Sequence, residues 1–369
     1  METGRPSMCL RIITSTPQAI MGGSGTFVGI TALANALREL GASVDEITPA
    51  LTSRIPIYTL RRILFNEALR FREPEKCDAT IGFDMDGYAV AQKKGSLYIA
   101  SIKGVIADEL RFESGLTRAT MRVQAAFEKR NVQRADLVLT TSRYSSARIQ
   151  ELYGLERAPS VVPELIDLAA WNELFSRTRG APNPRKFVVL SVCRFYPRKR
   201  LNILLLAAQR LRNRIPGLEV RIVGDGPEAA KLKNLCKTNS LQDVVKWLGN
   251  VSRSQLAREY NECDVFCLPS LQEGFGIVFL EAMAAGRSIV AARAAAVPEV
   301  VKHGLLAEPD DENSLAEAIE GLYLEPELRE SLGEAGREFV KQFDAPVVAK
   351  LFLDEIQRFL TPLAGSKKA

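Results

Sequence analysis

Two glutamates that flank a glycine-rich turn are the residues with the clearest potential for chemistry. Glu273 precedes residues 274–277, Gly-Phe-Gly-Ile, and Glu281 lies eight residues beyond Glu273. The turn follows an apolar strand at 265–268 and opens a helix expected at 278–285. Its amides would therefore be unpaired at a helix N-terminus, which favours an anion or an electron-rich oxygen. Eight residues leave about 80° of rotation around a helix, so both carboxylates share a similar face. The alternative is an ordinary capped helix in which Glu273 is simply an N-terminal carboxylate.

A second group of residues is cationic and follows the strand expected at 187–192. Arg194 offers a planar guanidinium and Lys199 a compact charge, and the loop between them contains Pro197. Five residues apart across such a loop, these cations can converge on a diphosphate. The neighbouring Arg198 and Arg200 are interpreted as a solvated basic turn.

A third motif, residues 224–229, satisfies the pattern G-x-G-x-x-A directly after an apolar strand. A dinucleotide-dependent oxidoreductase must therefore be considered. The next strand, 244–248, ends in Gly249-Asn250 and lacks the acidic residue that would bind a ribose 2′-hydroxyl. The turn at 22–25 also misses the pattern, because Val28 occupies the position of the third glycine.

Composition removes several classes of chemistry. The chain has one histidine, His303, which excludes zinc sites built on two or three histidines, and a Ser-His-Asp or Cys-His device would have to use it. The six cysteines form neither a C-x-x-C pair nor a clustered framework, and Cys263 and Cys267 are expected to be buried small hydrophobes. The net charge of +5 divides into +3 over 1–180 and +2 over 181–369, which argues against a nucleic-acid surface. We expect chemistry that uses carboxylates, cations, backbone amides or the substrate itself.

The elements that position these residues alternate along the chain. Short β-branched runs alternate with helical periods, which predicts an α/β fold with parallel sheets. In the first half we expect strands at 9–14, 43–47, 79–83, 97–101 and 136–140, and a helix at 27–40. In the second half we expect strands at 187–192, 219–223, 244–248, 265–268 and 288–292, and helices at 202–212, 228–238, 254–262 and 278–285.

The domain organisation is predicted from a break in this periodicity at 176–186, where Pro, Gly and charge accumulate. We expect two Rossmann-like domains, 1–180 and 187–344, facing each other across a cleft, with a helix at 345–362 packing back on the first domain. Open α/β sheets bind ligands at the carboxyl ends of their strands. No cleavable signal peptide and no apolar stretch of spanning length is found, which predicts a cytoplasmic protein.

In this order, the motifs resemble the retaining glycosyltransferases of family 4, the glycosyl transferases group 1, which have the GT-B fold. The matching elements are Gly22-Gly23, Ala135-Asp136 with Ser142, Arg194 with Lys199, Val223 to Pro227, Leu248 to Val251, Pro269-Ser270, Glu273, Glu281 and Pro298-Glu299. The resemblance covers nearly the whole chain and is strongest over 187–325. It implies a hexosyltransferase that moves a sugar from a nucleotide-diphosphate sugar to a hydroxyl acceptor, with retention of the anomeric configuration. The acceptor would be a glycan, a lipid-linked molecule or a small molecule.

The resemblance also implies roles for the matched residues. Arg194 and Lys199 would neutralise the diphosphate, Glu281 would hold the ribose hydroxyls, and Glu273 would hold sugar hydroxyls. The remaining donor-binding residues implied in this way are Gly22, Gly23, Gly224, Asn250, Val251, Gly274, Phe275, Gly276 and Ile277. No metal or other cofactor is expected, because the departing diphosphate is stabilised by protein cations and takes the proton of the acceptor.

The chain departs from the family pattern at Lys103. A histidine commonly follows this strand of the first domain in the family, whereas here the strand runs into Lys103-Gly104. Lys103 is expected to support the donor sugar or phosphate as a cation, and we count it among the catalytic candidates with Glu273, Lys199 and Arg194.

The acceptor side has weaker signals. Asp84, Asp86 and Asp108 lie near strand ends of the first domain and are candidates for binding acceptor hydroxyls, with loop and capping roles as the alternative. Residues 54–72 place Arg61, Arg62, Arg70 and Arg72 around apolar side chains in a basic amphipathic helix. Such a helix is expected either to rest on the inner face of an anionic membrane or to be an ordinary solvated face.

Two other functions remain open from sequence. The first is a catalytically silent protein that binds sugar nucleotides, which Lys103 in place of the usual histidine would favour. The second is an inverting transferase or epimerase of the same fold, with one of the three aspartates as its base.

Overall fold

The computed structural model describes residues 8–15, 25–49, 57–72, 76–91, 96–178 and 186–360. These residues form two compact units. Among the described residues, unit 1 contains those up to Leu165 except Gly25, together with residues 345–360, and unit 2 contains Gly25 and Ile166–Asp344. Most of the predicted linker, residues 179–185, lies outside the described residues.

The described part of unit 1 forms one parallel sheet in the order β2-β1-β3-β4-β5-β6. Its strands are β1 Cys9–Ile13, β2 Ser43–Ile47, β3 Ala79–Phe83, β4 Leu97–Ile102, β5 Leu137–Thr140 and β6 Ser160–Val161. Its helices are α1 Gly25–Glu39, α2 Tyr58–Ala68, α3 Ile106–Glu109, α4 Gly115–Arg134, α5 Arg143–Tyr153 and α14 Ala345–Leu360. Short 3₁₀ turns follow two of them, η1 Leu69–Phe71 and η2 Leu110–Phe112.

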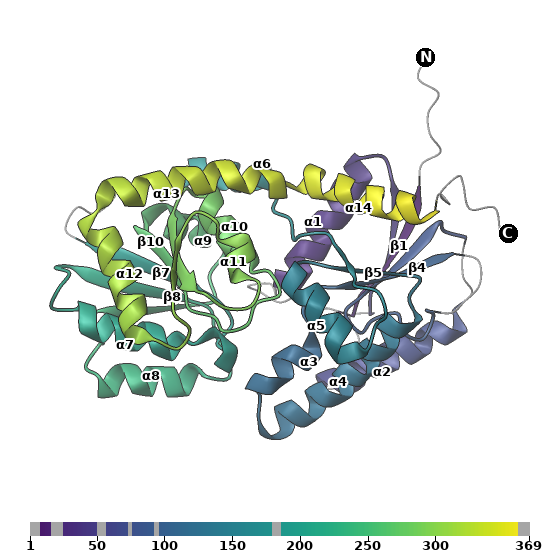
Figure 1. Ribbon diagram of the computed structural model, residues 1–369, viewed down its shortest axis with the longest axis horizontal. Coiled ribbons are helices and arrows are strands. Elements are labelled where there is room, and N and C mark those ends of the chain that lie inside the picture. Colours follow the sequence, from purple (N-terminus) through teal and green to yellow (C-terminus); the bar gives the residue numbers. More distant parts are fainter. Residues whose placement is uncertain are drawn as a thin grey trace, which may run out of the picture. The chain divides into compact units, whose positions relative to one another are not determined.

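Both faces of this sheet are covered, which explains why its central strands are nearly continuous apolar runs. On one face, side chains such as Ile81 and Ile99 pack with α1 and with Val348 and Phe352 of α14. On the other face, Ile102 packs with side chains of α4 and α5. The C-terminal helix therefore packs on unit 1, as expected from the sequence, and Figure 1 shows it in yellow along this unit.

The described part of unit 2 forms a second parallel sheet in the order β12-β11-β10-β7-β8-β9. Its strands are β7 Phe187–Val192, β8 Leu218–Val223, β9 Val245–Gly249, β10 Val265–Leu268, β11 Ser288–Ala292 and β12 Leu305–Ala307. Its helices are α6 Leu168–Arg177, α7 Leu201–Leu211, α8 Ala229–Thr238, α9 Arg253–Glu262, α10 Ile277–Ala284, α11 Val297–Val300, α12 Glu312–Leu324 and α13 Pro326–Phe339. The 3₁₀ turns are η3 Pro197–Lys199 and η4 Val340–Phe343.

The core of unit 2 likewise has two layers. Alternate residues of β7 divide between them, with Val189 facing the layer of α7 and α12 and Leu190 facing the layer of α9 and α10. Helix starts are fixed locally, for example by the Asp167 carboxylate and the Ser252 hydroxyl, which accept hydrogen bonds from backbone amides at the starts of α6 and α9. The expected α/β architecture with two parallel sheets is thus confirmed.

Two strands of the sheets were not expected from the sequence. Strand β6 has two residues and β12 has three, and each lies at an edge of its sheet. Runs this short carry no alternation that could distinguish them from loops. No helix in the described part of the chain has the length and apolar character needed to span a membrane.

Candidate functional site

The two most informative motifs of the sequence meet at one edge of the unit 2 sheet. The cation loop, residues 193–200, follows β7, and the glutamate loop, residues 269–276, follows β10. Because β7 and β10 are parallel neighbours, their carboxyl ends share an edge. A backbone hydrogen bond of 2.9 Å from the Leu271 amide to the Arg198 carbonyl joins the two loops.

Lys199 and Glu273 form an ion pair between these loops. The Lys199 Nζ lies 2.6 Å from the Glu273 Oε1, and the two side chains are only 12% and 9% exposed. Burial removes water from both charges, so each depends on the other for its stabilisation. The two loops therefore hold a buried pair without net charge, in which Lys199 is the hydrogen-bond donor and Glu273 is the acceptor.

Helix α10 begins directly after the glutamate loop. Gly276 precedes its first residue with φ 94°, and no side chain caps the helix start. A Cβ at Gly276 would lie 2.6 Å from the Phe279 ring, so only glycine fits both this conformation and this space. Within the described residues, no partner is recorded for the buried Ser270 hydroxyl or the Gln272 amide, which gives the loop further hydrogen-bonding capacity.

Glu281 lies inside α10 and is buried. Its Oε2 accepts a 2.9 Å hydrogen bond from the Tyr260 hydroxyl of α9. Burial raises the pKa of Glu281 to about 7, whereas the hydrogen bond from Tyr260 and the charge of Arg253 oppose this rise. The two predicted glutamates therefore differ in the structure, since Glu273 is held by a cation and Glu281 by a phenol.

The other predicted donor residues of unit 2 follow neighbouring strands at the same edge. Arg194 is exposed just after β7, and it forms no ion pair within the part of the chain that is described. Gly224 follows β8 with φ 118°, where a Cβ would lie 2.0 Å from the Cys193 carbonyl oxygen. Asn250 and Val251 follow β9. The Phe275 side chain packs edge-on against the ring of Phe343. Gly22 and Gly23 lie outside the described residues.

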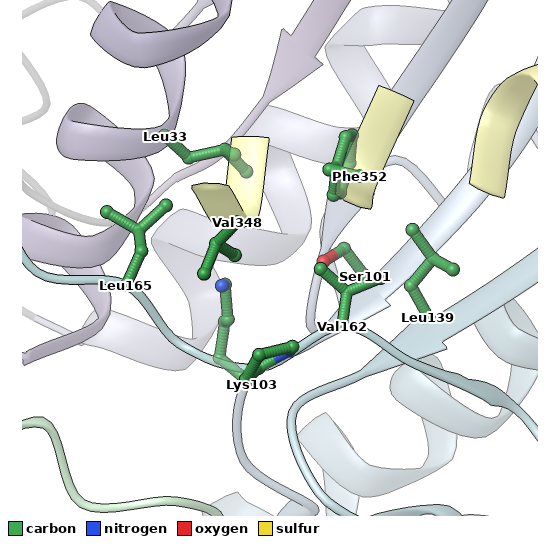
Figure 2. Close-up of a pocket in the computed structure, with 9 residues that line it drawn as sticks. Leu33, Ser101, Lys103, Leu139, Val162, Leu165, Val348 and Phe352 are labelled. Atoms are coloured by element: carbon green, nitrogen blue, oxygen red, sulfur yellow. The ribbon is translucent and has the colours of Figure 1, made fainter. Parts of the chain in front are cut away.

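In unit 1, Lys103 follows β4 and is buried. Its Nζ lies 2.9 Å from the Glu164 Oε2, and the two side chains are 7% and 8% exposed. The Lys103 side chain extends toward Val348 in a small cavity that is also lined by Ser101 and Phe352 (Figure 2). Lys103 is therefore neutralised within unit 1, and its catalytic role stays a prediction.

The three aspartates of unit 1 differ from one another. Asp86 is fully buried and accepts hydrogen bonds from Ser15, Asn66 and Arg62, the last at 3.1 Å. Asp108 is also fully buried, and it accepts from Tyr144 at 2.7 Å and from Arg148 at 3.0 Å. Both carboxylates are engaged by the protein itself, which favours structural roles for them.

Asp84 is the aspartate that keeps some exposure. Its backbone has φ 54°, and its Oδ1 accepts a 2.9 Å hydrogen bond from the Lys103 amide. Burial raises the pKa of Asp84 to about 6, and Arg62 opposes the rise. Asp84 is thus the acceptor candidate with the chemistry best suited to binding or releasing a proton near neutral pH.

The basic amphipathic helix is present over α2 and η1, but one arginine is not on its surface. Arg62 was predicted among the surface cations, whereas it is buried beside Asp86, with Asn66 on the same buried face. Apolar side chains are exposed instead, among them Leu60, Leu64 and Phe71. The helix therefore buries part of its polar face and exposes apolar side chains, because the buried Asp86 carboxylate needs the guanidinium of Arg62 and the amide of Asn66 as hydrogen-bond donors.

Glu128 is a buried acid that the sequence reading missed. It lies fully buried on α4, where its Oε2 accepts hydrogen bonds from the Ile106 amide at 2.9 Å and from the Tyr153 hydroxyl. No partner is recorded for its Oε1 among the described residues. Burial and the nearby Asp84 charge raise the pKa of Glu128 well above its usual value.

Glu164 and Tyr260 were also not predicted from the sequence, because each contacts a site candidate that is distant in sequence, Lys103 and Glu281 respectively. Glu164 pairs with a residue 61 positions away, and Tyr260 with one 21 positions away. Neither residue lies in a motif. For Arg62 a signal exists, since its spacing of four from Asn66 places both polar side chains on one face of a helix.

Comparison with known proteins finds a family match for the part of the chain that contains the cation loop and the glutamate loop. Residues 173–339 match the family model described as glycosyl transferases group 1. This part of the chain is therefore similar to glycosyl transferases group 1. The match includes both loops and Glu281, which confirms the resemblance seen in the sequence.

Two curated relatives are similar to this chain over somewhat more than half of its length. A GDP-mannose-dependent alpha-(1-6)-phosphatidylinositol monomannoside mannosyltransferase of Mycobacterium tuberculosis is 31% identical over 56% of this chain and 57% of its own length. A D-inositol 3-phosphate glycosyltransferase of Pseudarthrobacter chlorophenolicus is 31% identical over 56% of this chain and 52% of its own. The chain thus spans little more than half the length of these relatives in the matched region.

Solved structures with the same fold cover nearly the whole chain. Sucrose-phosphate synthase from Thermosynechococcus elongatus has a TM-score of 0.80 at 22% identity, covering 96% of this chain and 99% of its own. The Anabaena protein HepE, solved in complex with UDP and glucose, has a TM-score of 0.72 at 19% identity, covering 95% and 100%. The fold of this chain is therefore that of known GT-B structures.

The buried Glu128 gives a pH-dependent prediction. A folded-state pKa above the unfolded value means that the group contributes stability below the unfolded pKa and that this contribution is lost as pH rises through the folded pKa. Glu128→Gln removes the titration and keeps an oxygen for Tyr153. We expect the free energy of unfolding of the variant, relative to the natural protein, to increase by up to about 1.4 kcal/mol for each pH unit as the pH rises above the usual pKa of a glutamate.

Urea denaturation at several pH values measures this difference. The exposed Glu156→Gln serves as the control and should follow the natural protein at every pH. Parallel stability profiles for Glu128→Gln and the natural protein would contradict the buried, protonated state of Glu128.

Proposed function

We propose that this protein is a retaining glycosyltransferase that moves a sugar from a nucleotide-diphosphate sugar to a hydroxyl acceptor without a metal ion. The observation that carries the proposal is the buried Lys199–Glu273 pair at the shared edge of β7 and β10. When a phosphorylated sugar binds, Lys199 and Glu273 separate, and the ligand supplies a new partner for each of them. The phosphate oxygens replace the carboxylate beside Lys199, and sugar hydroxyls replace the ammonium beside Glu273.

The remaining residues of unit 2 then have complementary tasks. Arg194, which is exposed after β7, adds a second positive charge for the diphosphate. The amides at the start of α10 donate to sugar or phosphate oxygens. Glu281 accepts from the ribose hydroxyls, and the main chain at Asn250 and Val251 borders the base. Departure of the diphosphate is stabilised by these fixed charges, and its oxygen takes the proton of the acceptor.

The relatives support a nucleotide-sugar donor for this chain. The mycobacterial relative is named as GDP-mannose-dependent, and the Anabaena structure contains UDP and glucose. The nucleotide and the sugar differ between these two proteins. We therefore propose only that the donor is a nucleotide-diphosphate sugar. A panel of such sugars would identify which nucleotide and which sugar this chain uses.

On the acceptor side, we propose that Asp84 contributes to binding the acceptor hydroxyl. It is the predicted aspartate that combines partial exposure with a raised pKa, of about 6. Its backbone neighbours fix it, because the Lys103 amide donates to its Oδ1 and the Asn131 side chain donates to its carbonyl.

We further propose that unit 1 contacts an anionic membrane from the cytoplasm through α2, η1 and α4. Leu64 is 47% exposed, Phe71 89% and Leu116 80%, so apolar side chains project from this surface. The surface is also cationic, because the one acidic residue of α4, Glu128, is buried while Arg118, Arg122 and Lys129 are exposed. This combination of exposed apolar and cationic side chains is typical of helices that rest on an anionic lipid surface.

The donor site predicts the effect of removing Lys199. We expect one member of a panel of UDP-, GDP-, ADP- and dTDP-sugars to raise the melting temperature of the natural protein. Transfer of the sugar from that donor, measured as kcat/KM, should fall about 100-fold or more in Lys199→Ala, the scale of losing one charge-stabilising donor. The exposed Lys246→Ala is the matched control and should keep full activity. Activity should survive EDTA, and NMR of the product should show a retained anomeric configuration.

Three outcomes would count against this function. If no nucleotide sugar raised the melting temperature of the protein, the proposal that its donor is a nucleotide sugar would be contradicted. Binding without turnover in the presence of a wide set of hydroxyl acceptors would favour a silent binding protein. An inverted product would assign the chain to the inverting alternative.

The membrane surface predicts selective binding to anionic vesicles. The natural protein should sediment with phosphatidylglycerol vesicles and not with phosphatidylcholine vesicles. The double variant Leu64→Ser/Phe71→Ser should bind at least about fivefold more weakly, because it removes much of the apolar area available for insertion. Leu324→Ser, at a 66% exposed leucine of unit 2, is the control. Equal binding of all three proteins, or no binding at low salt, would contradict the membrane contact.

A further inference from the structure

Two cysteines that are far apart in sequence lie side by side in unit 1. Cys9 is the first residue of β1, and Cys77 lies two residues before β3. The Sγ atoms of Cys9 and Cys77 are 2.9 Å apart. A disulfide bond has a length of about 2.05 Å, so the two sulfurs are within about 0.9 Å of bonding distance.

The backbone around this pair is held in register. Strands β1 and β3 are parallel neighbours, and Leu10 is opposite Ala79. The Asp78 carboxylate accepts a 2.7 Å hydrogen bond from the Cys9 amide, and the Asp78 amide donates to the Cys9 carbonyl at 2.9 Å. The sulfurs therefore meet across two strands whose separation is fixed by the sheet.

We infer that Cys9 and Cys77 form a reversible disulfide that links β1 to the start of β3. The reaction needs an oxidant, which we assign to the class of low-molecular-weight disulfides. The Cys9 thiolate attacks that disulfide, forming a mixed disulfide and releasing one small thiolate. The Cys77 thiol then loses its proton and attacks the Cys9 sulfur, which forms the Cys9–Cys77 bond and releases the second small thiolate. Two protein thiols are oxidised, and one small disulfide is reduced to two thiols.

The order of attack follows from exposure. Cys9 is partly exposed, whereas Cys77 is buried. Burial and then the hydrogen bond with Cys9 raise the pKa of the Cys77 thiol to about 11. Cys77 is therefore a poor first nucleophile and is suited to resolving a mixed disulfide already formed beside it.

The remaining cysteines lack this arrangement. Cys236, Cys263 and Cys267 are buried in unit 2, and Cys193 is partly exposed. No sulfur contact between these four is recorded in the described residues, which include all six cysteines. Oxidation is thus directed to one pair.

The bond would close a loop that contains α1, β2 and α2 and would stabilise unit 1 by restricting its unfolded chain. It lies at the amino ends of the strands, opposite the edge that carries Asp84 and Lys103. The inference is independent of the proposed function.

The test uses the full chain in glutathione buffers of increasing oxidised fraction. Thiol counting in denaturant should fall from six free thiols to four, and peptide mapping should find one link between Cys9 and Cys77. Cys193→Ser should still lose two thiols, whereas Cys9→Ser should form no internal link. The urea midpoint of the natural protein should rise on oxidation, and that rise should be absent in Cys9→Ser.

Retention of six free thiols under all conditions would overturn the inference. So would lost thiols that map only to mixed disulfides or to other cysteines. A linked protein with an unchanged or lower urea midpoint would overturn the stabilising role of the bond.

Discussion

The buried ion pair between Lys199 and Glu273 is the interaction on which the candidate site of unit 2 and its proposed chemistry depend. Burying either charge without the other would cost much free energy, because both side chains are largely removed from water. The sheet must therefore bring both loops to one edge. The parallel pairing of β7 with β10 achieves this, and the hydrogen bond between Leu271 and Arg198 fixes the loops to each other. The glycine before α10 then opens the helix N-terminus beside the pair. Fold and site are therefore linked, because the two loops must keep the charges of Lys199 and Glu273 together.

A second buried charge determines the surface of unit 1. Asp86 needs donors inside the protein, and α2 supplies them from Arg62 and Asn66. Because the polar face of α2 is buried, apolar side chains of α2 are exposed on the same surface as the cations of α4. Other cations of α4 and η1 repel one another, since desolvation and then the charges of Arg130 and Arg70 lower the pKa of Arg134. An anionic membrane would relieve this repulsion, so the proposed membrane contact would follow from the way the core of unit 1 is built.

The sequence predicts the two sheets well and places the candidate donor residues at strand ends, because both depend on local pattern. Apolar runs with glycine turns after them mark strand ends, and the carboxyl ends of parallel strands lie at one edge. The pattern does not tell which face of α2 is buried, because periodicity groups Arg62 with Asn66 without saying what lies opposite them. The partners Glu164 of Lys103 and Cys77 of Cys9 were equally hidden, since these contacts join residues 61 and 68 positions apart. Only the assembled sheet brings such residues together.

Calorimetric titration of Glu273→Gln tests the central role of the pair most directly. The nucleoside diphosphate is compared with the intact nucleotide sugar selected by the donor panel. Loss of the carboxylate leaves Lys199 uncompensated, so the variant should bind the free nucleoside diphosphate about tenfold more tightly than the natural protein does, a gain of about 1.4 kcal/mol. Binding of the nucleotide sugar should gain less, because its hydroxyls lose their acceptor. Equal or weaker binding of the nucleoside diphosphate by the variant would contradict the account.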